Sequence, residues 1–510
     1  MSTLPNSPAV DDSRGGFLKK LEILGNKLPN PAILFLILIA LLAVGSAILA
    51  SQHVSAIHPL THKPIFIKSL LSQEGLQWIF TDMIKNYLAF PPLGMIMVLT
   101  LGIGLLEKAG FMDAAIKSAV HAIPPKYVTF TIVIISFMSH MASDAAIVVV
   151  PPIAAMLFYS LGRHPFAGFA ASLAAIYSGF TANILIVTTD VLLSGISTQA
   201  AAIVDPTIIV TPIDNWYFAS FSVLCLSILA TVVTEKFVEP RLGVYKGKRD
   251  VVLEKPTDNQ MAALRFTGWV ALAFVAVLLL LVVPEGAVLR NPETGGIPGS
   301  PFIRGIVPSL FLFLLSLGLA YGIKVGSIKT GDDVIHMMSE SMKGLSGFLV
   351  MVFVIAQFIA AFTWTNVATL IATSGADFLK NIHMTGLPAL WCMMLLGQLL
   401  GLFIASGSAI WALLSPVFVP MFMLLGYHPA FIQMAFRAGD GALNTVQIVN
   451  PFLPLFLEDM KKYKEDTGIG TYLSLMMPYA LSFFVMFYVL FTIWYLLALP
   501  VGPGIPQRLW

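Results

Sequence analysis

The sequence predicts an all-α polytopic membrane protein with nine transmembrane helices, two opposed re-entrant hairpins and an inverted repeat with broken helices. Hydrophobic residues make up 57% of the 510 residues and charged residues only 11%, against roughly 25% charged residues in a soluble domain. Several apolar stretches reach the roughly 20 residues that a helix needs to cross a bilayer. Two longer apolar regions, 127–196 and 387–458, are interrupted by glycine, serine, proline and charged residues.

Composition also excludes several classes of protein. The formal net charge of +2 argues against a nucleic-acid partner, and the two cysteines, Cys225 and Cys392, both lie in apolar runs. A disulfide framework or a thiolate metal cluster is therefore excluded. The sequence has no GxxxxGK[ST] phosphate loop, HExxH motif or serine nucleophile elbow, so we expect neither an ATP-driven pump nor an enzyme. Residues 1–30 are polar, with no apolar core followed by a small-residue cleavage site, so we expect no cleaved signal peptide.

The nine crossings follow from the apolar segments taken in order. In each interrupted region a hairpin enters and leaves on one side of the membrane, at 127–162 and 387–426. A broken helix then crosses, at 165–196 and 429–458. The seven continuous spans are 31–50, 87–106, 216–234, 266–283, 305–323, 345–372 and 472–499.

The lysines and arginines orient these crossings. With the N-terminus cytoplasmic, 21 of the 29 basic residues fall on inner segments, seven fall on outer segments, and Arg437 lies within the membrane. This bias is the one that the positive-inside rule predicts. The charge distribution also permits each hairpin to cross the membrane twice. Two extra crossings leave the following segments on the same side of the membrane, so the positive-inside rule does not distinguish the two arrangements. The polar hairpin tips favour the re-entrant interpretation.

The two interrupted regions match each other at an offset of 264 residues. Nine identities fall within 144–174, and the string LGxHP occurs at both 161–165 and 425–429. An internal duplication whose halves are separated by one span places the halves in opposite orientations, as in secondary transporters. We divide the chain into a cytoplasmic N-terminal segment, a first half, a basic cytoplasmic loop with the linking span, a second half and a tail: 1–30, 31–236, 237–303, 304–500 and 501–510.

Polar residues interrupt the first half at the hairpin tip and in the broken helix. The tip reads SHMASDA over 139–145, and the broken helix reads SGFTAN over 178–183 and TTD over 188–190. Non-helical backbone at this depth is tolerated only where it is buried in protein or lines a wet cavity, and its free oxygens suit Na⁺. The candidate sodium ligands are Ser143, Asp144, Asn183 and Asn444.

Each ionisable residue here has two interpretations. Asp144 is an N-cap of the second hairpin arm, an ion ligand, or both. Asp190 has no neighbouring cation in the sequence and no capping position, so we interpret it as a proton carrier or ion ligand, with a buried hydrogen-bonding role as the alternative. His140 is a buried structural histidine or a proton shuttle, and we favour the former. His164 and His428, at equivalent turns before proline, are interpreted as architectural.

In the second half, the hairpin tip ASGSA at 405–409 is followed by Trp411 and then by a broken helix that contains RAGDGALNT at 437–445. Arg437 and Asp440 either pair on one helical face, or Arg437 exchanges Asp440 for a substrate carboxylate. Trp411 is either a stacking surface for an aromatic ligand or an ordinary packing residue. We interpret the glycines of the GDG string as helix breakers.

These strings together resemble the p-aminobenzoyl-glutamate transporter (AbgT) family over nearly the whole chain. The resemblance is carried by GNKLP at 25–29, SHMASD at 139–144, SGFTAN at 178–183 and RAGD at 437–440. It implies nine membrane helices, two opposed hairpins and a bowl-shaped homodimer. By motif, the residues that it implies for transport are Asp190, Ser408, Trp411, Pro429, Arg437 and Asp440; Asn183 and Asn444 complete our candidate set.

The resemblance also implies cation-coupled transport of p-aminobenzoyl-glutamate or p-aminobenzoate, with export of sulfonamide antimetabolites as a related activity. We therefore expect a proton- or sodium-coupled transporter of a small aromatic carboxylate in the bacterial inner membrane, in contact with membrane lipid. No cofactor is expected apart from a bound sodium ion. The alternatives are a symporter of dicarboxylates or other small organic anions and a passive anion channel.

Overall fold

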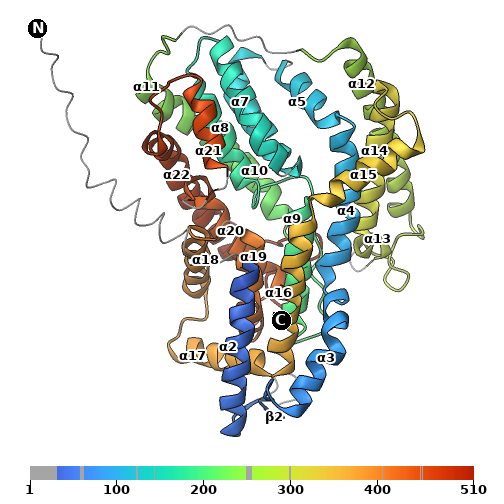
Figure 1. Cartoon of the computed structure of the whole chain (residues 1–510), viewed down its shortest axis with the longest axis vertical. Helices are drawn as coiled ribbons and strands as arrows, with labels where there is room; N and C mark the ends of the chain where they lie inside the picture. The colour runs from blue at the N-terminus through green and yellow to red at the C-terminus, as the bar shows by residue number, and fades with distance from the viewer. Residues whose placement is uncertain are drawn as a thin grey trace, which may run out of the picture.

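The computed structural model of the chain describes residues 31–57, 63–121, 124–142, 144–247, 255–297, 300–404, 406–447, 450 and 452–510. The expected N-terminal segment, 1–30, lies outside these residues. Within them, seven helical stretches are long and apolar enough to cross a membrane (Figure 1). They are α2 (Pro31–Ser51), α3 with α4 (Gln73–Leu88 and Pro91–Lys108), α10 (Trp216–Val233), α12 (Asp258–Val282), α14 (Ile306–Val325), α16 (Ser346–Trp364) and α22 (Ile469–Leu496).

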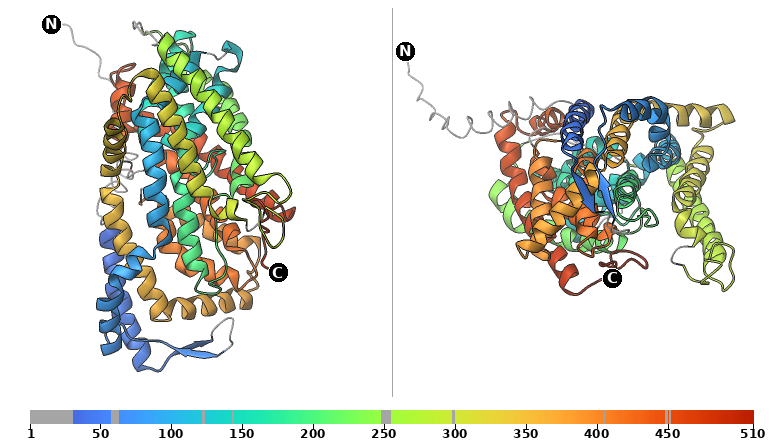
Figure 2. Two further views of the ribbon diagram at one scale, coloured as in Figure 1. Left: turned by 90° about the vertical axis from the view of Figure 1, so that its right-hand side faces the viewer. Right: turned by 90° about the horizontal axis from the view of Figure 1, so that it is seen from below.

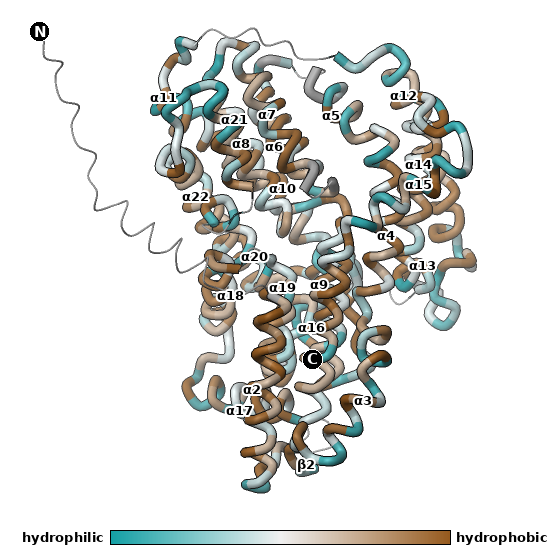
Figure 3. Tube along the Cα trace, viewed as in Figure 1, coloured by the Kyte–Doolittle hydropathy of each residue, from teal (hydrophilic) through white to brown (hydrophobic). Residues whose placement is uncertain are grey.

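These helices occupy the seven continuous spans expected from the sequence, with one correction. The span expected at 345–372 is wrong beyond Trp364, where α16 ends. Asn366 then adopts a left-handed conformation with φ of 62° and redirects the chain into α17 (Val367–Asn381). Apolar composition continues past the turn, so hydropathy alone did not reveal it. Apolar residues follow the shafts of the long helices and polar residues gather at their ends (Figure 3).

Several short elements lie outside the expected spans. A two-stranded antiparallel hairpin pairs Ser55 with Phe66, and together with α2 and α3 it projects at one end of the molecule (Figure 2). The helix after Thr330 begins with a capping box between Thr330 and Asp333. These elements are β1 (Ser55–Ile57), β2 (Pro64–Phe66), α5 (Phe111–His121), α11 (Glu239–Leu242), α13 (Pro301–Arg304) and α15 (Gly331–Lys343).

Each interrupted region contains a pair of short helices followed by a helix that breaks. The pairs are α6 (Val128–Ser139) with α7 (Asp144–Ser160), and α18 (Leu387–Gly401) with α19 (Gly407–Met423). Figure 1 shows the first pair in the upper half of the molecule and the second in the lower half. The broken helices are α8 (Pro165–Ser178) with α9 (Thr188–Ala201), and α20 (Pro429–Leu443) with η4 (Asn444–Val446) and α21 (Leu453–Lys461). Nine crossings, re-entrant pairs and the domain boundaries stay predictions.

The repeated LGxHP string builds the same turn twice. The glycine is left-handed in both copies, with φ of +72° at Gly162 and +89° at Gly426. The histidine ring Nδ1 of each copy, His164 and His428, accepts a hydrogen bond of 3.2 Å from the backbone N–H two residues later. Each ring therefore caps a helix that begins with proline. The architectural interpretation of the two histidines is confirmed, and the shared geometry supports the proposed duplication.

Helix α20 lies at the centre of the molecule, where every residue from Pro429 to Ala442 is buried. Its glycines do not break it, which corrects the expectation for the GDG string. A Cβ at Gly439 would lie 2.5 Å from the carbonyl oxygen of Met394, and a Cβ at Gly441 would collide with the hydroxyl of Thr181. The glycines permit close packing, and the α-helix ends only at Leu443.

Candidate functional site

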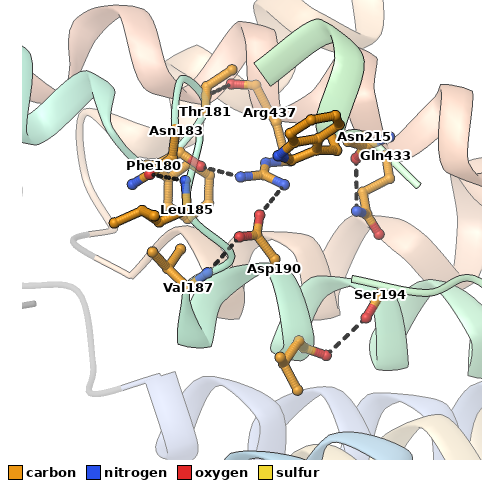
Figure 4. Close-up of polar contacts among 12 residues, drawn as sticks. Phe180, Thr181, Asn183, Leu185, Val187, Asp190, Ser194, Asn215, Gln433 and Arg437 are labelled. Atoms are coloured by element: carbon orange, nitrogen blue, oxygen red, sulfur yellow. Dashed lines mark hydrogen bonds and ion pairs between the residues drawn. The ribbon is translucent and has the colours of Figure 1, made fainter. Parts of the chain in front are cut away.

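The non-helical segment between α8 and α9 lies against α20, so the first half contacts the second half at the break. The Thr181 hydroxyl donates a hydrogen bond of 2.5 Å to the carbonyl oxygen of Arg437 (Figure 4). The Ser178 hydroxyl donates one of 3.1 Å to the carbonyl oxygen of Gly441. These hydroxyls come from the SGFTAN string. Its polar residues are therefore used to join the broken helix to its counterpart in the other half.

A buried ion pair lies where the break between α8 and α9 contacts α20. Arg437 Nη1 lies 2.6 Å from Asp190 Oδ1, and the side chains are only 2% and 9% exposed. Arg437 Nη2 donates a second hydrogen bond, of 2.6 Å, to the carbonyl oxygen of Phe180. This carbonyl lies in the break between α8 and α9 and accepts no hydrogen bond from a helical N–H of the described residues. The guanidinium fork thus binds a carboxylate and a free backbone carbonyl at once (Figure 4). Two charges removed from water in this way are stable only as a pair.

Asp190 also caps the helix that carries it. Its Oδ2 accepts a hydrogen bond of 2.8 Å from the backbone N–H of Val187, which precedes α9. The sequence interpretation that gave Asp190 no capping position is therefore wrong, whereas its statement that no cation neighbours Asp190 in the sequence holds. The cation that pairs with Asp190 is Arg437, which lies 247 positions further along the chain. The capping role was missed because the start of α9 could not be located before the break was known.

Asp440 does not pair with Arg437, so the alternative in which the two residues pair on one helical face is wrong. Arg437 extends towards α9, whereas Asp440 lies towards the facing ends of α18 and α19. There Asp440 Oδ2 accepts a hydrogen bond of 3.3 Å from Asn444 Nδ2. A Cβ at Gly407 would lie 2.8 Å from the same oxygen. The glycine at the start of α19 therefore leaves the room that this second carboxylate occupies.

Trp411 is completely buried in this structure and packs against protein. Its ring stacks on Phe436 at 4.7 Å between centroids. Its indole Nε1 donates a hydrogen bond of 2.9 Å to Ser197, whose hydroxyl donates one of 2.6 Å to Gln433. Gln433 in turn donates to Asn215. The packing interpretation of Trp411 therefore describes this conformation.

The chain of hydrogen bonds from Trp411 through Ser197 and Gln433 to Asn215 was missed by the sequence analysis. It joins α19, α9, α20 and the segment before α10 around the Arg437 pair. The signal that could have revealed it is Gln433, a polar residue one helical turn before Arg437 in an otherwise apolar segment.

The remaining candidates have local structural roles here. Ser406 caps α19, and its hydroxyl lies 3.1 Å from that of Ser408. Pro429 is the first residue of α20. Asn183 donates to the carbonyl oxygen of Phe137 and accepts from the backbone N–H of Leu185.

The expected sodium site is only partly covered by the described residues. Ser143 lies outside them, and Asp144 is described only as the first residue of α7. Asn183 and Asn444 bond to different partners, Phe137 and Asp440. No group of three or more histidine, cysteine, aspartate or glutamate side chains among the described residues is arranged to hold a metal ion.

Comparison with known proteins shows the family. Residues 16–509 match the model of the AbgT putative transporter family. The chain is 46% identical over 509 residues to the p-aminobenzoyl-glutamate transport protein of Escherichia coli K12, covering 100% of this chain and 99% of that protein.

Two solved structures resemble the fold. The Alcanivorax borkumensis YdaH transporter has a TM-score of 0.89 and 36% identity over 93% of this chain and 100% of that one. Neisseria gonorrhoeae MtrF, described with a class of antimetabolite efflux pumps, has a TM-score of 0.90 and 39% identity over 96% of this chain and 100% of that one. The chain therefore belongs to the AbgT family of transport proteins.

Proposed function

We propose that this protein is a cation-coupled secondary active transporter of p-aminobenzoyl-glutamate and p-aminobenzoate. Family membership and the relative from Escherichia coli support the substrate class. The resemblance to MtrF supports sulfonamide export as a related activity. The observation that carries the proposal is the buried pair of Arg437 and Asp190 where the two halves cross.

Arg437 is the group that binds the substrate carboxylate. Its planar fork already binds the carboxylate of Asp190 and the carbonyl of Phe180, which is the donor geometry that a benzoate or glutamate carboxylate requires. A substrate therefore takes the place of Asp190. This revises the sequence hypothesis, in which the residue exchanged was Asp440.

Exchange at Arg437 couples transport to a cation. An aspartate released from its arginine inside the protein is a buried, uncompensated charge, which costs several kcal/mol. Asp190 therefore takes up a proton or a cation when substrate occupies Arg437. Asp440 with Asn444 is the second place where a proton or sodium ion acts, because this carboxylate is also buried and no ion pair forms at it among the described residues.

The remaining expectations complete the proposal. The chain is a multi-pass protein of a bacterial inner membrane with its N-terminus in the cytoplasm, it crosses nine times, and it forms a homodimer. The helix pairs with their broken helices move relative to the rest. Trp411, released from Phe436 by that movement, presents its ring to the aromatic part of the substrate.

Transport into proteoliposomes tests the proposal, with proton and sodium gradients imposed separately. Accumulation of p-aminobenzoate against its gradient, driven by either ion, is expected. A passive channel would equilibrate the substrate without concentrating it. Competition identifies the substrate class: p-aminobenzoyl-glutamate should inhibit uptake strongly, and a stronger effect of succinate would favour a dicarboxylate transporter instead.

A further inference from the structure

A cavity of about 360 Å³ lies between the start of α8, the start of α22 and the helix end that follows α10; Figure 1 shows how these helices are arranged. The bias of basic residues assigns this end to the cytoplasmic membrane surface. None of the candidate transport residues lines the cavity. Its lining is Phe166, Val238, Arg241, Leu242, Gly470, Thr471, Ser474, Leu475 and Pro478.

Arg241 supplies the cavity with a positive charge. Its Nη2 donates a hydrogen bond of 2.6 Å to the Ser474 hydroxyl, and its Nη1 donates one of 3.3 Å to the Ser474 carbonyl. Pro478 explains the second bond, because proline has no N–H to give the carbonyl four residues earlier. Among the described residues, no carboxylate forms an ion pair with Arg241. The guanidinium keeps further donors, and its charge is uncompensated.

A neighbouring arginine shows the contrast. Arg163 lies at the turn before α8, and its Nε and Nη2 donate hydrogen bonds of 2.8 and 2.6 Å to the two carboxylate oxygens of Glu239. Its charge is already neutralised within the protein. Of these two arginines, Arg241 is therefore the one that an external anion can approach.

Apart from Thr471 and Ser474, the rest of the cavity lining is apolar, and the apolar surface continues along α22. Phe166, Leu475 and Pro478 form part of its walls. On the same face of α22, Met477 is 42% exposed and Leu481 is 57% exposed, as expected for side chains that contact acyl chains. A soluble anion would gain nothing from these walls, whereas an amphiphile would gain from both the charge and the apolar surface.

We propose that this cavity binds one anionic phospholipid of the cytoplasmic leaflet. The lipid phosphate binds the free donors of Arg241, and one acyl chain follows Leu475 and the exposed stripe of α22. The bound lipid bridges α8, which carries the first helix break, to α22. It is therefore placed to link the composition of the membrane to the part of the protein that contains the transport site.

Lipid titration in detergent, followed by native mass spectrometry of the intact protein, tests the proposal. The wild-type protein should bind phosphatidylglycerol more tightly than phosphatidylcholine. Arg241→Ala should weaken phosphatidylglycerol binding about fivefold, equivalent to ~1 kcal/mol, and leave phosphatidylcholine binding unchanged. Arg265→Ala, at an exposed arginine of α12 outside the cavity, is the matched control and should change neither. Equal behaviour of the two variants would overturn the proposal.

A second variant keeps Arg241 intact. No atom lies within 4 Å of a Cβ placed at Gly470, so Gly470→Leu fills the cavity without a clash at Cβ and should reduce phosphatidylglycerol binding. Gly45→Leu, at an equally open glycine of α2, is its control. Unchanged binding in Gly470→Leu contradicts the proposal even if Arg241→Ala fails to fold. Displacement of the lipid by millimolar inorganic phosphate alone would show an anion site and would also overturn it.

Discussion

Asp190→Asn tests the central ion pair most directly. The substitution removes the charge that compensates Arg437, at a contact of 2.6 Å between side chains that are 2% and 9% exposed. Breaking a buried pair by removing one partner costs about 3–5 kcal/mol. Asparagine keeps an acceptor for the Val187 N–H, so α9 keeps its cap. We therefore expect a loss near the lower end, about 3 kcal/mol of unfolding free energy.

The functional effect should differ from the effect on stability. Asparagine cannot carry a proton, so substrate accumulation driven by an imposed gradient should be lost in proteoliposomes. Substrate binding should persist or tighten, because the residue that competes for the Arg437 guanidinium has lost its charge. Binding of p-aminobenzoate to purified protein, measured beside transport at several pH values, separates the two effects.

Asp459→Asn is the matched control. Asp459 is also largely buried and pairs with a lysine, Lys462, at 2.5 Å, but it lies on α21 away from the crossing. This control should keep the pH and sodium dependence of the wild type. If Asp190→Asn also kept both, Asp190 would not be the carrier. If the destabilisation in Asp190→Asn and Arg437→Gln simply added in the double variant, the pair would have no coupling energy.

Substitutions at three further sites, Arg437, Trp411 and Gly439, have distinct expected outcomes. Arg437→Lys keeps the charge but loses the fork, so substrate affinity should fall about tenfold or more; wild-type affinity would exclude a bidentate contact. Trp411→Phe should keep the ring stacking and lose one hydrogen bond, which lowers the free energy of unfolding by about 1 kcal/mol. Trp411→Ala should lower it by about 3–5 kcal/mol. Equal losses of stability in thermal unfolding would contradict this expectation. Gly439→Ala forces a Cβ against the Met394 carbonyl and should cost about 1–3 kcal/mol, while Gly45→Ala, where nothing is near, should not destabilise; similar melting temperatures would refute the packing role.

Much of the architecture is readable in the sequence because lipid imposes simple rules. A helix must be apolar and of sufficient length, so hydropathy found the long helices. It failed at 365–372 because an apolar chain can turn at a residue such as Asn366 without any change in composition. The LGxHP turns were predicted correctly as architectural because glycine, histidine and proline each have a local backbone role there.

The glycines of α20 were misread for a related reason. Glycine weakens a helix, but it also allows close approach of a neighbour, and the sequence does not say which role applies. Only the position of Met394 on α18 decides it for Gly439.

Composition and periodicity alone predicted a polytopic membrane protein with polar breaks, because these are properties of the chain itself, and the resemblance of its motifs to the AbgT family supplied the transport function. The sequence also identified Asp190, Arg437 and Asp440 as residues whose charge must be compensated. Tertiary structure decided which charges meet. Arg437 forms no ion pair with Asp440, three residues away, and instead pairs with Asp190 from the other half. The physical reason is that a buried ion pair depends on distance and direction in space, and packing of α20 against the α8–α9 break sets both.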